Sequence, residues 1–304
     1  MSIDELRRIQ KSIKSKSLII DISSYVIIII VLCCRYFSLK NSIYSVIVDD
    51  LFSCIINVLI IVALIRGVFI KIKQFVIERE LKEFNDNYKK TFILSSLMKS
   101  FDNLTYDFDR GLPMDVIAST ELIDLADAYS SNDYVSGTYR NIRFEQADVI
   151  IEKRDEDDDY IKVFLGKWII FDFGKKFYSN IHIYKRSLKN WWKGKYKEIK
   201  LEDETFNKKY LVFAENEHDA FYVLTPHFME KIDSVMSKLD CEVSLGFVDN
   251  KLHIAINNYN DSFEYNVYKE INEEKIISEV SKDIKIIIDF VDELQLDNDL
   301  FKNN

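Results

Sequence analysis

The chain has 304 residues and a formal charge of −9 at pH 7, from 41 Lys and Arg against 50 Asp and Glu. Residues 1–73 carry a net charge of +5, so the remaining residues carry −14. A part this acidic excludes a general electrostatic attraction for nucleic acid or for an anionic membrane surface. The length accommodates a membrane segment and one domain of about 200 residues.

Residues 17–73 contain two apolar runs separated by a short polar loop, and they predict a transmembrane hairpin. The runs, 18–34 and 51–70, reach the length of about 20 residues that a membrane-crossing helix needs. This requires Asp21 and Arg66 to lie near the ends of the runs, at the membrane interface. The alternatives are two core helices of a soluble domain, or a cleaved signal peptide, although no small-residue cleavage site follows the first run.

The distribution of Lys and Arg around the two runs predicts the orientation of the hairpin. Five basic residues lie within residues 1–16, three more lie at Arg66, Lys71 and Lys73, and the connecting loop holds two. Basic residues favour the cytoplasmic side. We therefore expect a multi-pass protein of the inner (plasma) membrane, with a basic cytoplasmic N-terminus over residues 1–16 and a cytoplasmic C-terminal domain.

The four cysteines do not form a recognisable covalent or metal-binding pattern. Cys33, Cys34 and Cys54 lie in the apolar runs, and Cys241 is far from them in the sequence. No disulfide framework or zinc spacing can be built from these positions, which is typical of a reducing cytoplasm. We expect no cofactor and no metal. Acylation of Cys33 or Cys34 is an alternative to simple burial in the membrane.

Residues 74–132 predict a helical stalk and a linker. No Gly or Pro interrupts residues 68–110, and apolar residues recur at steps of three and four up to Phe101. One interpretation is a coiled-coil-like seam through which the protein forms an oligomer. The other is a helix packed on its own domain, which fewer than three clean heptads favour. Residues 106–113 end the helix, and short helical turns follow over 114–129.

Residues 133–304 predict a cytosolic α+β domain with a largely antiparallel sheet. We expect a helix over 225–239 that begins at Thr225-Pro226, and a last helix over about 270–296. A hairpin is expected across Asp249-Asn250, and Gly166 is expected to mark a bulge. The predicted strands cover 142–151, 160–173, 181–184, 209–213, 220–224, 243–248 and 252–256.

Several short motifs of this part occur in an order that resembles a known family. The segments are 106–109, 133–137, 164–166, 172–173, 176–177, 203–213, 224–230, 247–256 and 263–264. Together they resemble the bacterial, membrane-anchored family of domains of unknown function numbered thirty-one thirty-seven, over about residues 80 to 300. Trp168 and Ile169 depart from its pattern but stay apolar. The resemblance implies N-terminal membrane segments and supplies no catalytic residues.

The sequence contains none of the common enzyme motifs. The seven glycines form no phosphate loop or dinucleotide fingerprint, and there is no nucleophile elbow or HExxH. His218-Asp219 is a pair of the kind that metal phosphohydrolases use, but its place in an apparent turn between two predicted strands favours a solvated turn instead. The acidic run 155–159 lacks the glycine and spaced ligands of a calcium loop, so we interpret it as a solvated hairpin end.

The stretch around Trp191 and Trp192 is the most unusual candidate for a surface site. Lys193 and Lys195 accompany the two tryptophans within an otherwise acidic domain. Aromatic and basic groups together are typical of contact with a membrane interface or an anionic partner. The alternative is a tryptophan pair packed in the core with solvated lysines around it.

These observations predict a non-catalytic, membrane-tethered cytosolic module with an interaction or regulatory role. Its partners would be the lipid bilayer, through residues 17–73, and a protein; nucleic acid is not expected. The alternative function is a membrane-anchored, metal-dependent hydrolase that uses acidic residues and His218.

Overall fold

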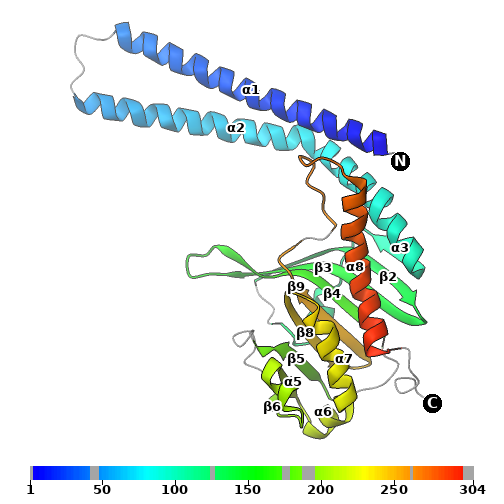
Figure 1. Ribbon diagram of the computed structural model, residues 1–304. Coiled ribbons are helices and arrows are strands. Elements are labelled where there is room, and N and C mark those ends of the chain that lie inside the picture. Colours follow the sequence, from blue (N-terminus) through cyan, green and yellow to red (C-terminus); the bar gives the residue numbers. More distant parts are fainter. Residues whose placement is uncertain are drawn as a thin grey trace. The chain divides into compact units, whose positions relative to one another are not determined.

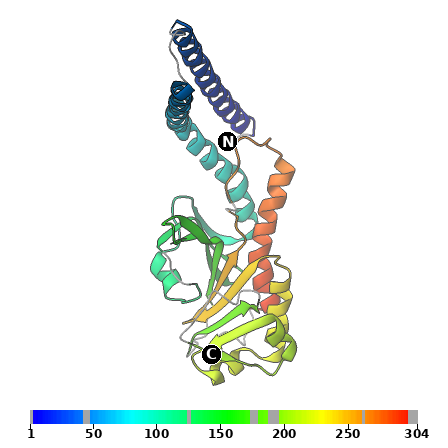
Figure 2. The same cartoon turned by 90° about the vertical axis from the view of Figure 1, so that its left-hand side faces the viewer.

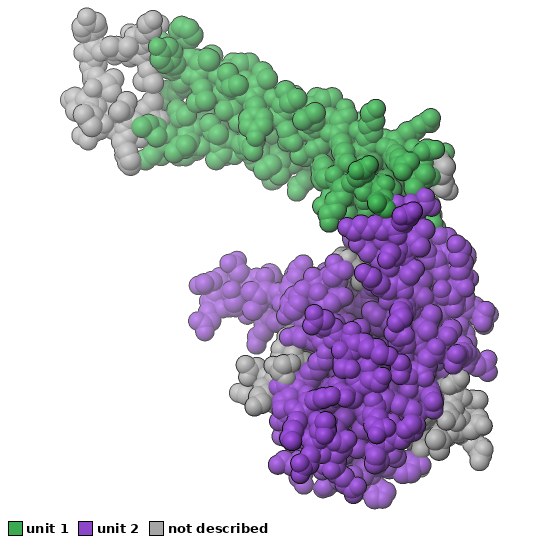
Figure 3. All heavy atoms as spheres, viewed as in Figure 1, with its two compact units in different colours: residues 1–91, 265–272 green, residues 92–264, 273–304 purple. Residues whose placement is uncertain are grey.

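The computed structural model describes residues 3–41, 48–123, 127–172, 179–186, 196–260 and 263–296. The chain forms two compact units, shown in Figure 3 in different colours. Residues 1–91 and 265–272 form the first, which we call the hairpin unit. Residues 92–264 and 273–304 form the second, which we call the sheet unit.

The hairpin unit consists mainly of two long helices that lie side by side (Figure 1). They are α1 (Ile3–Asn41) and α2 (Val48–Tyr88). At 1.5 Å per residue each is about 60 Å long, which is twice the thickness of a bilayer core. Helix α2 therefore continues well beyond the second apolar run, as the periodicity of the stalk residues predicts. A π-helical turn, η1 (Lys89–Leu94), follows α2, and α3 (Ser95–Ser100) comes next.

The sheet unit contains a nine-stranded antiparallel sheet that does not close, with strand order β1-β2-β3-β4-β9-β8-β5-β7-β6. The predicted α+β class is confirmed. The strands are β1 (Asp102–Asp107), β2 (Ala128–Tyr139), β3 (Ile142–Arg154), β4 (Tyr160–Asp172), β5 (Ile181–Lys185), β6 (Lys197–Ile199), β7 (Tyr210–Ala214), β8 (Glu242–Val248) and β9 (Lys251–Asn257).

Helices cover both faces of this sheet (Figure 2). One face is covered by α7 (Pro226–Ser237) and α8 (Glu273–Leu294), which pack against each other. The short α4 (Met114–Ala118) lies over the other face, where a cluster of buried apolar side chains includes Trp168 and Ile117. Two further short helices, α5 (Glu204–Lys209) and α6 (Glu217–Val223), lie next to β7 in the chain.

Local signals placed α7, α8 and the β8–β9 hairpin correctly. Thr225 caps α7 by accepting a hydrogen bond from the Phe228 amide at 3.4 Å, and Pro226 occupies the first turn. Asp249 has a φ of 55°, the left-handed conformation that the tight turn between β8 and β9 requires.

The predicted strand over 220–224 is wrong, because residues 220–223 belong to α6 and Leu224 is its C-cap. Asn216 caps the helix, since its side chain accepts a hydrogen bond from the His218 amide at 3.0 Å. Acidic Glu217 and Asp219 in the first turn favour the helix further. The sheet also starts earlier than predicted. The edge strand β1 has only two apolar residues, Leu104 and Tyr106, and β2 begins with a polar stretch, residues 130–132, so neither carries a long apolar pattern.

Gly166 does not mark a bulge. The irregularity in the β3–β4 pairing lies at Val163, because Ile151 pairs with Phe164 and the next residue pairs with Lys162. Gly166 pairs regularly on both sides, but a Cβ atom there would overlap the carbonyl oxygen of Ile256. The glycine is therefore explained by the close approach of β9.

Candidate functional site

The hairpin unit exposes a continuous apolar surface. Large apolar side chains are exposed along residues 18–37 of α1 and 55–76 of α2, whereas none is exposed along 3–17 or 77–88. Both helices are long and apolar enough to cross a membrane. Of the most apolar 18-residue stretch, only 11% is buried in the first helix and 0% in the second. Core helices of a soluble domain would bury these side chains, so that alternative does not fit the structure.

Two ion pairs join α1 and α2 where the exposed apolar surface begins. Lys73 Nζ lies 2.7 Å from Asp21 Oδ2, and the Lys16 ammonium contacts the Glu80 carboxylate. These contacts align the two helices so that the apolar surfaces of both start at the same level. We expected Asp21 to avoid the lipid by its position alone; the structure adds a cationic partner, which further lowers the cost of that position.

The expected position of Arg66 near the end of the apolar surface is wrong, because exposed apolar side chains continue to Val76 and Arg66 lies about two helical turns before Lys73. Its guanidinium lies over the ring of Tyr25, 4.9 Å from the centroid. A cation–π contact of this kind reduces the cost of a charge that is only partly hydrated.

The cysteines divide between the two units. Cys33 and Cys34 are free and exposed on the apolar surface of α1. Cys241 is half-buried in the sheet unit, and burial raises the pKa of its thiol. Because a nucleophilic cysteine needs a lowered pKa, Cys241 is poorly suited to that role.

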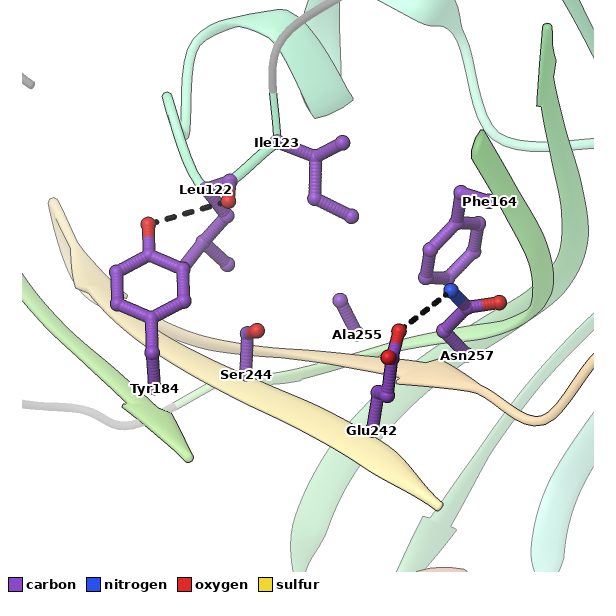
Figure 4. Close-up of a pocket in the computed structure, with 8 residues that line it drawn as sticks. All are labelled: Leu122, Ile123, Phe164, Tyr184, Glu242, Ser244, Ala255 and Asn257. Atoms are coloured by element: carbon purple, nitrogen blue, oxygen red, sulfur yellow. Dashed lines mark hydrogen bonds between the residues drawn. The ribbon is translucent and has the colours of Figure 1, made fainter. Parts of the chain in front are cut away.

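A small pocket lies on the sheet face that α4 covers (Figure 4). Two hydrogen bonds join groups of its lining: Tyr184 donates to the carbonyl oxygen of Leu122 at 3.1 Å, and Asn257 Nδ2 donates to Glu242 Oε2 at 2.9 Å. The free volume is about 10 Å³. That space suits one water molecule and is far too small for a substrate.

Two histidines are buried in the same sheet. His182 belongs to β5 and His253 to β9, the two strands that flank β8, and both residues pair with Gly246 of β8. Trp168 Nε1 donates a hydrogen bond to His253 Nδ1 at 3.3 Å. Burial lowers the pKa of His182 to about 4 and that of His253 to about 3, so both are neutral at pH 7. They contribute packing and neutral hydrogen bonding to the core.

Residues from three separate motifs of the family resemblance meet in the sheet unit. Tyr106 Oη donates a hydrogen bond to the buried Asp133 at 2.6 Å, and the Tyr106 ring lies 6.0 Å from that of Phe263. Lys167 Nζ lies over the same Phe263 ring at 4.7 Å and 3.0 Å from Asp283. Burial and Asp133 raise the pKa of Tyr106 far above its usual range. The arrangement fixes the tyrosine as a donor to Asp133.

The residues proposed for membrane or partner contact, Trp191, Trp192, Lys193 and Lys195, lie outside the described part of the chain. His218 is 88% exposed at the start of α6, and its Nδ1 lies 3.9 Å from Asp219. Among the residues that the structure describes, no group of three or more His, Cys, Asp or Glu could hold a metal ion. Within the described part of the chain, the hypothesis of a metal-dependent hydrolase is therefore supported only by the adjacent pair His218 and Asp219.

Sequence reasoning missed the segment Tyr265–Asn272, which belongs to the hairpin unit although it lies between β9 and α8 in the sequence. Its first residue, Tyr265, packs against two rings of α2, Tyr88 at 5.0 Å and Phe84 at 6.2 Å between centroids. The segment has no periodicity, so no local signal in the sequence indicates where it docks.

Fold and hairpin together define a class: an antiparallel α+β domain that follows two apolar helices. Residues 162–296 match the model of a family described as "Protein of unknown function (DUF3137)". The resemblance predicted from the sequence is thereby confirmed for this part of the chain. The segments 106–109 and 133–137 lie outside the match.

One solved structure is similar at a low level. The crystal structure of the mycobacterial trehalose monomycolate transport factor A, TtfA, aligns with 70% of this chain and 94% of its own, at 12% identity and a TM-score of 0.38. A similarity this low supports no conclusion about function. No curated protein matches the chain.

Proposed function

We propose that the protein is a membrane-tethered cytosolic module that binds a partner and does not catalyse a reaction. The observation that carries the proposal is the sharp start of the exposed apolar surface at Leu18 on α1 and Val76 on α2, beside the ion pairs of the hairpin. A surface of this kind suits a bilayer with a defined boundary to water.

The basic residues support a cytoplasmic orientation. Because α1 and α2 are antiparallel, the beginning of α1 and the end of α2 lie at the same end of the hairpin. Seven of the ten Lys and Arg within residues 1–73 belong to this end, two belong to the connection between the apolar runs, and Arg66 lies inside the apolar part of α2. The positive-inside rule then places this end, and the sheet unit that follows, in the cytoplasm at the inner membrane.

Support for a binding rather than a catalytic role comes from the sheet unit. Tyr184, Glu242 and Asn257 of its pocket are hydrogen-bonded, and its two buried histidines are neutral. Among the described residues, the exposed His218 belongs to no cluster that could hold a metal ion. A catalytic site would gather reactive groups around a cavity that admits a substrate.

Reporter fusions in bacteria test the location. Green fluorescent protein fused after residue 304 should fluoresce, and alkaline phosphatase at the same place should be inactive, because the latter matures only outside the cytoplasm. The matched control is alkaline phosphatase inserted between residues 42 and 47, which should be active. Activity of the C-terminal phosphatase fusion would overturn the orientation. Full-length protein in the supernatant after lysis without detergent would overturn the tether.

The tryptophan–lysine stretch is proposed as an additional contact to an anionic surface or partner. Replacing Trp191, Trp192, Lys193 and Lys195 by alanine should weaken capture of the full chain's cytosolic binding partner in cross-linking experiments. An unchanged set of cross-linked products would remove this stretch from the proposal.

We also propose an oligomer formed through the stalk helix. The predicted seam residues Ile77, Phe84 and Tyr88 are already buried within a single chain. Cross-linking of the full chain in membranes should distinguish a dimer from a monomer, and a uniformly monomeric protein would leave the stalk packed only on its own chain.

A further inference from the structure

The segment Tyr265–Asn272, which we call the strap, is held firmly in the hairpin unit. Gln10 Nε2 of α1 donates hydrogen bonds to two carbonyl oxygens of the strap, that of Val267 at 2.8 Å and that of Lys269 at 2.6 Å. Gln10 and Val267 are both buried, so the first of these bonds satisfies polar groups that water cannot reach. The strap is therefore fixed along α1.

Tyr268 gives the level of the strap along α1. Its hydroxyl lies 3.4 Å from the Ser17 Oγ, and Leu18, the next residue, is the first large apolar side chain that α1 exposes. Tyr268 itself remains 52% exposed. A half-exposed tyrosine at the boundary between an apolar and an aqueous surface is typical of the headgroup layer of a bilayer.

Basic groups lie at the same level. Lys14 Nζ is 3.5 Å from the Lys269 carbonyl oxygen, and the Lys269 side chain is exposed. Lys11 is exposed one turn earlier on α1. Cations next to an interfacial tyrosine favour a surface of anionic lipid headgroups.

We propose that the strap is a third membrane contact of this protein, with Tyr268 inserted into the headgroup layer beside α1. The partner is the lipid interface, and the inference rests on the proposed function in which the hairpin spans a bilayer. The chain thus returns to the membrane surface after the sheet has been completed by β9, and it leaves again into α8.

Site-directed spin labelling of the full chain tests this in vesicles of phosphatidylethanolamine and phosphatidylglycerol. The native cysteines are replaced by serine, and single labels are placed by Tyr268→Cys, Ile60→Cys and Tyr259→Cys. Tyr259 is the matched control, because it is 58% exposed and belongs to the sheet unit. The measured quantity is the ratio of collision rates with oxygen, which is concentrated in lipid, to those with a water-soluble nickel chelate.

The ratio at residue 268 should lie between the high value at residue 60 and the low value at residue 259. Adding Gln10→Ala should shift it to the value at residue 259, because the strap loses the bonds that hold it on α1. A ratio at 268 equal to that at 259 in the parent chain, with a high value at 60, would overturn the strap contact alone. A low value at residue 60 would overturn the membrane hairpin, and with it the proposed function.

Discussion

The hairpin unit and the sheet unit use the same apolar residue types in opposite ways. Isoleucine side chains of α1 and α2, such as Ile30 and Ile60, are 55% and 52% exposed, whereas Ile169 and Ile254 of the sheet are completely buried. An apolar surface of that extent would be unfavourable in water, so the two units are built for different solvents. Composition alone does not distinguish them; the direction in which the side chains point does.

Charged residues show the same contrast. In the hairpin unit the Asp21–Lys73 pair lies at the boundary of the apolar surface, and both side chains are partly exposed. In the sheet unit Lys167 is completely buried, and its ammonium pairs with Asp283 of α8 at 3.0 Å. A completely buried charge depends on its partner, while a boundary charge can also be hydrated.

The largest effect is expected for Asp283→Ala, which leaves the buried Lys167 ammonium without its ion-pair partner. We expect a loss of about 3–5 kcal/mol in the free energy of unfolding of the sheet unit. The measurement is urea unfolding of the detergent-solubilised chain, followed by tryptophan fluorescence, because all three tryptophans belong to the sheet unit. The control is Lys285→Ala, which removes an exposed pair with Asp289 on the same helix and should cost about 0.5 kcal/mol. Equal effects of both variants would contradict the distinction between buried and exposed charges.

The next effect breaks the comparison directly by placing one charge on each unit. Ile60→Lys should disfavour membrane insertion by about 3 kcal/mol, because Ile60 is exposed to lipid in the proposed function. Ile277→Lys is the control, since this α8 residue is 43% exposed to water and the change should cost less than about 0.5 kcal/mol. The readout is the fraction of protein that resists extraction of membranes with alkaline carbonate. If both variants extracted like the parent chain, the hairpin would not be in contact with lipid.

A pH-dependent effect should be confined to the sheet unit, which contains all four histidines. Burial lowers the pKa of His182 to about 4 and of His253 to about 3, below the value of about 6.5 in an unfolded chain. The unfolded state therefore binds more protons between pH 6.5 and 4, and stability falls as the pH falls through this window. Between pH 6.5 and 5.5 we expect a loss of about 2 kcal/mol from the two histidines together.

The same urea experiment at several pH values checks this prediction. His182→Gln and His253→Gln should each flatten the pH dependence, whereas His218→Asn, at an exposed position, should leave it unchanged. The fraction of the full chain that sediments with the membranes should not vary between pH 6.5 and 4, because no histidine lies in the hairpin unit. If the variant that carries both His182→Gln and His253→Gln kept the pH dependence of the free energy of unfolding, groups other than these two histidines would cause it.

Local signals explain which parts of this structure could be predicted from the sequence. The two apolar helices, α7 with its Thr225-Pro226 start, and the turn at Asp249 each carry their signal within a few residues. The strand expected at 220–224 failed because the cap at Asn216 outweighed the β-forming residues Phe221 and Tyr222. The edge strand β1 was missed because only two of its six residues, Leu104 and Tyr106, are apolar, which is too few to show a period.

The candidate site was less predictable, because its contacts join distant parts of the chain. Gln10 and Val267 are 257 residues apart, and no periodicity indicates that a single glutamine binds a later loop. The sequence located the hairpin and its charges, but only the structure shows that Asp21 pairs with Lys73. The stretch around Trp191 and Trp192 stays a prediction, because it lies outside the described residues.

The smallest expected effect compares one glycine from each unit. Gly166→Ala should destabilise the sheet unit by at least about 1 kcal/mol, because the added methyl group overlaps the carbonyl oxygen of Ile256 on β9. Gly67→Ala meets no atom within 4 Å, so the hairpin should tolerate it, and alanine is the better helix former in water. Urea unfolding measures the first and carbonate extraction the second. The sheet packs backbone against backbone, whereas this side of α2 faces only solvent or lipid, so a cost at Gly67 as large as that at Gly166 would mean that another surface covers α2 there.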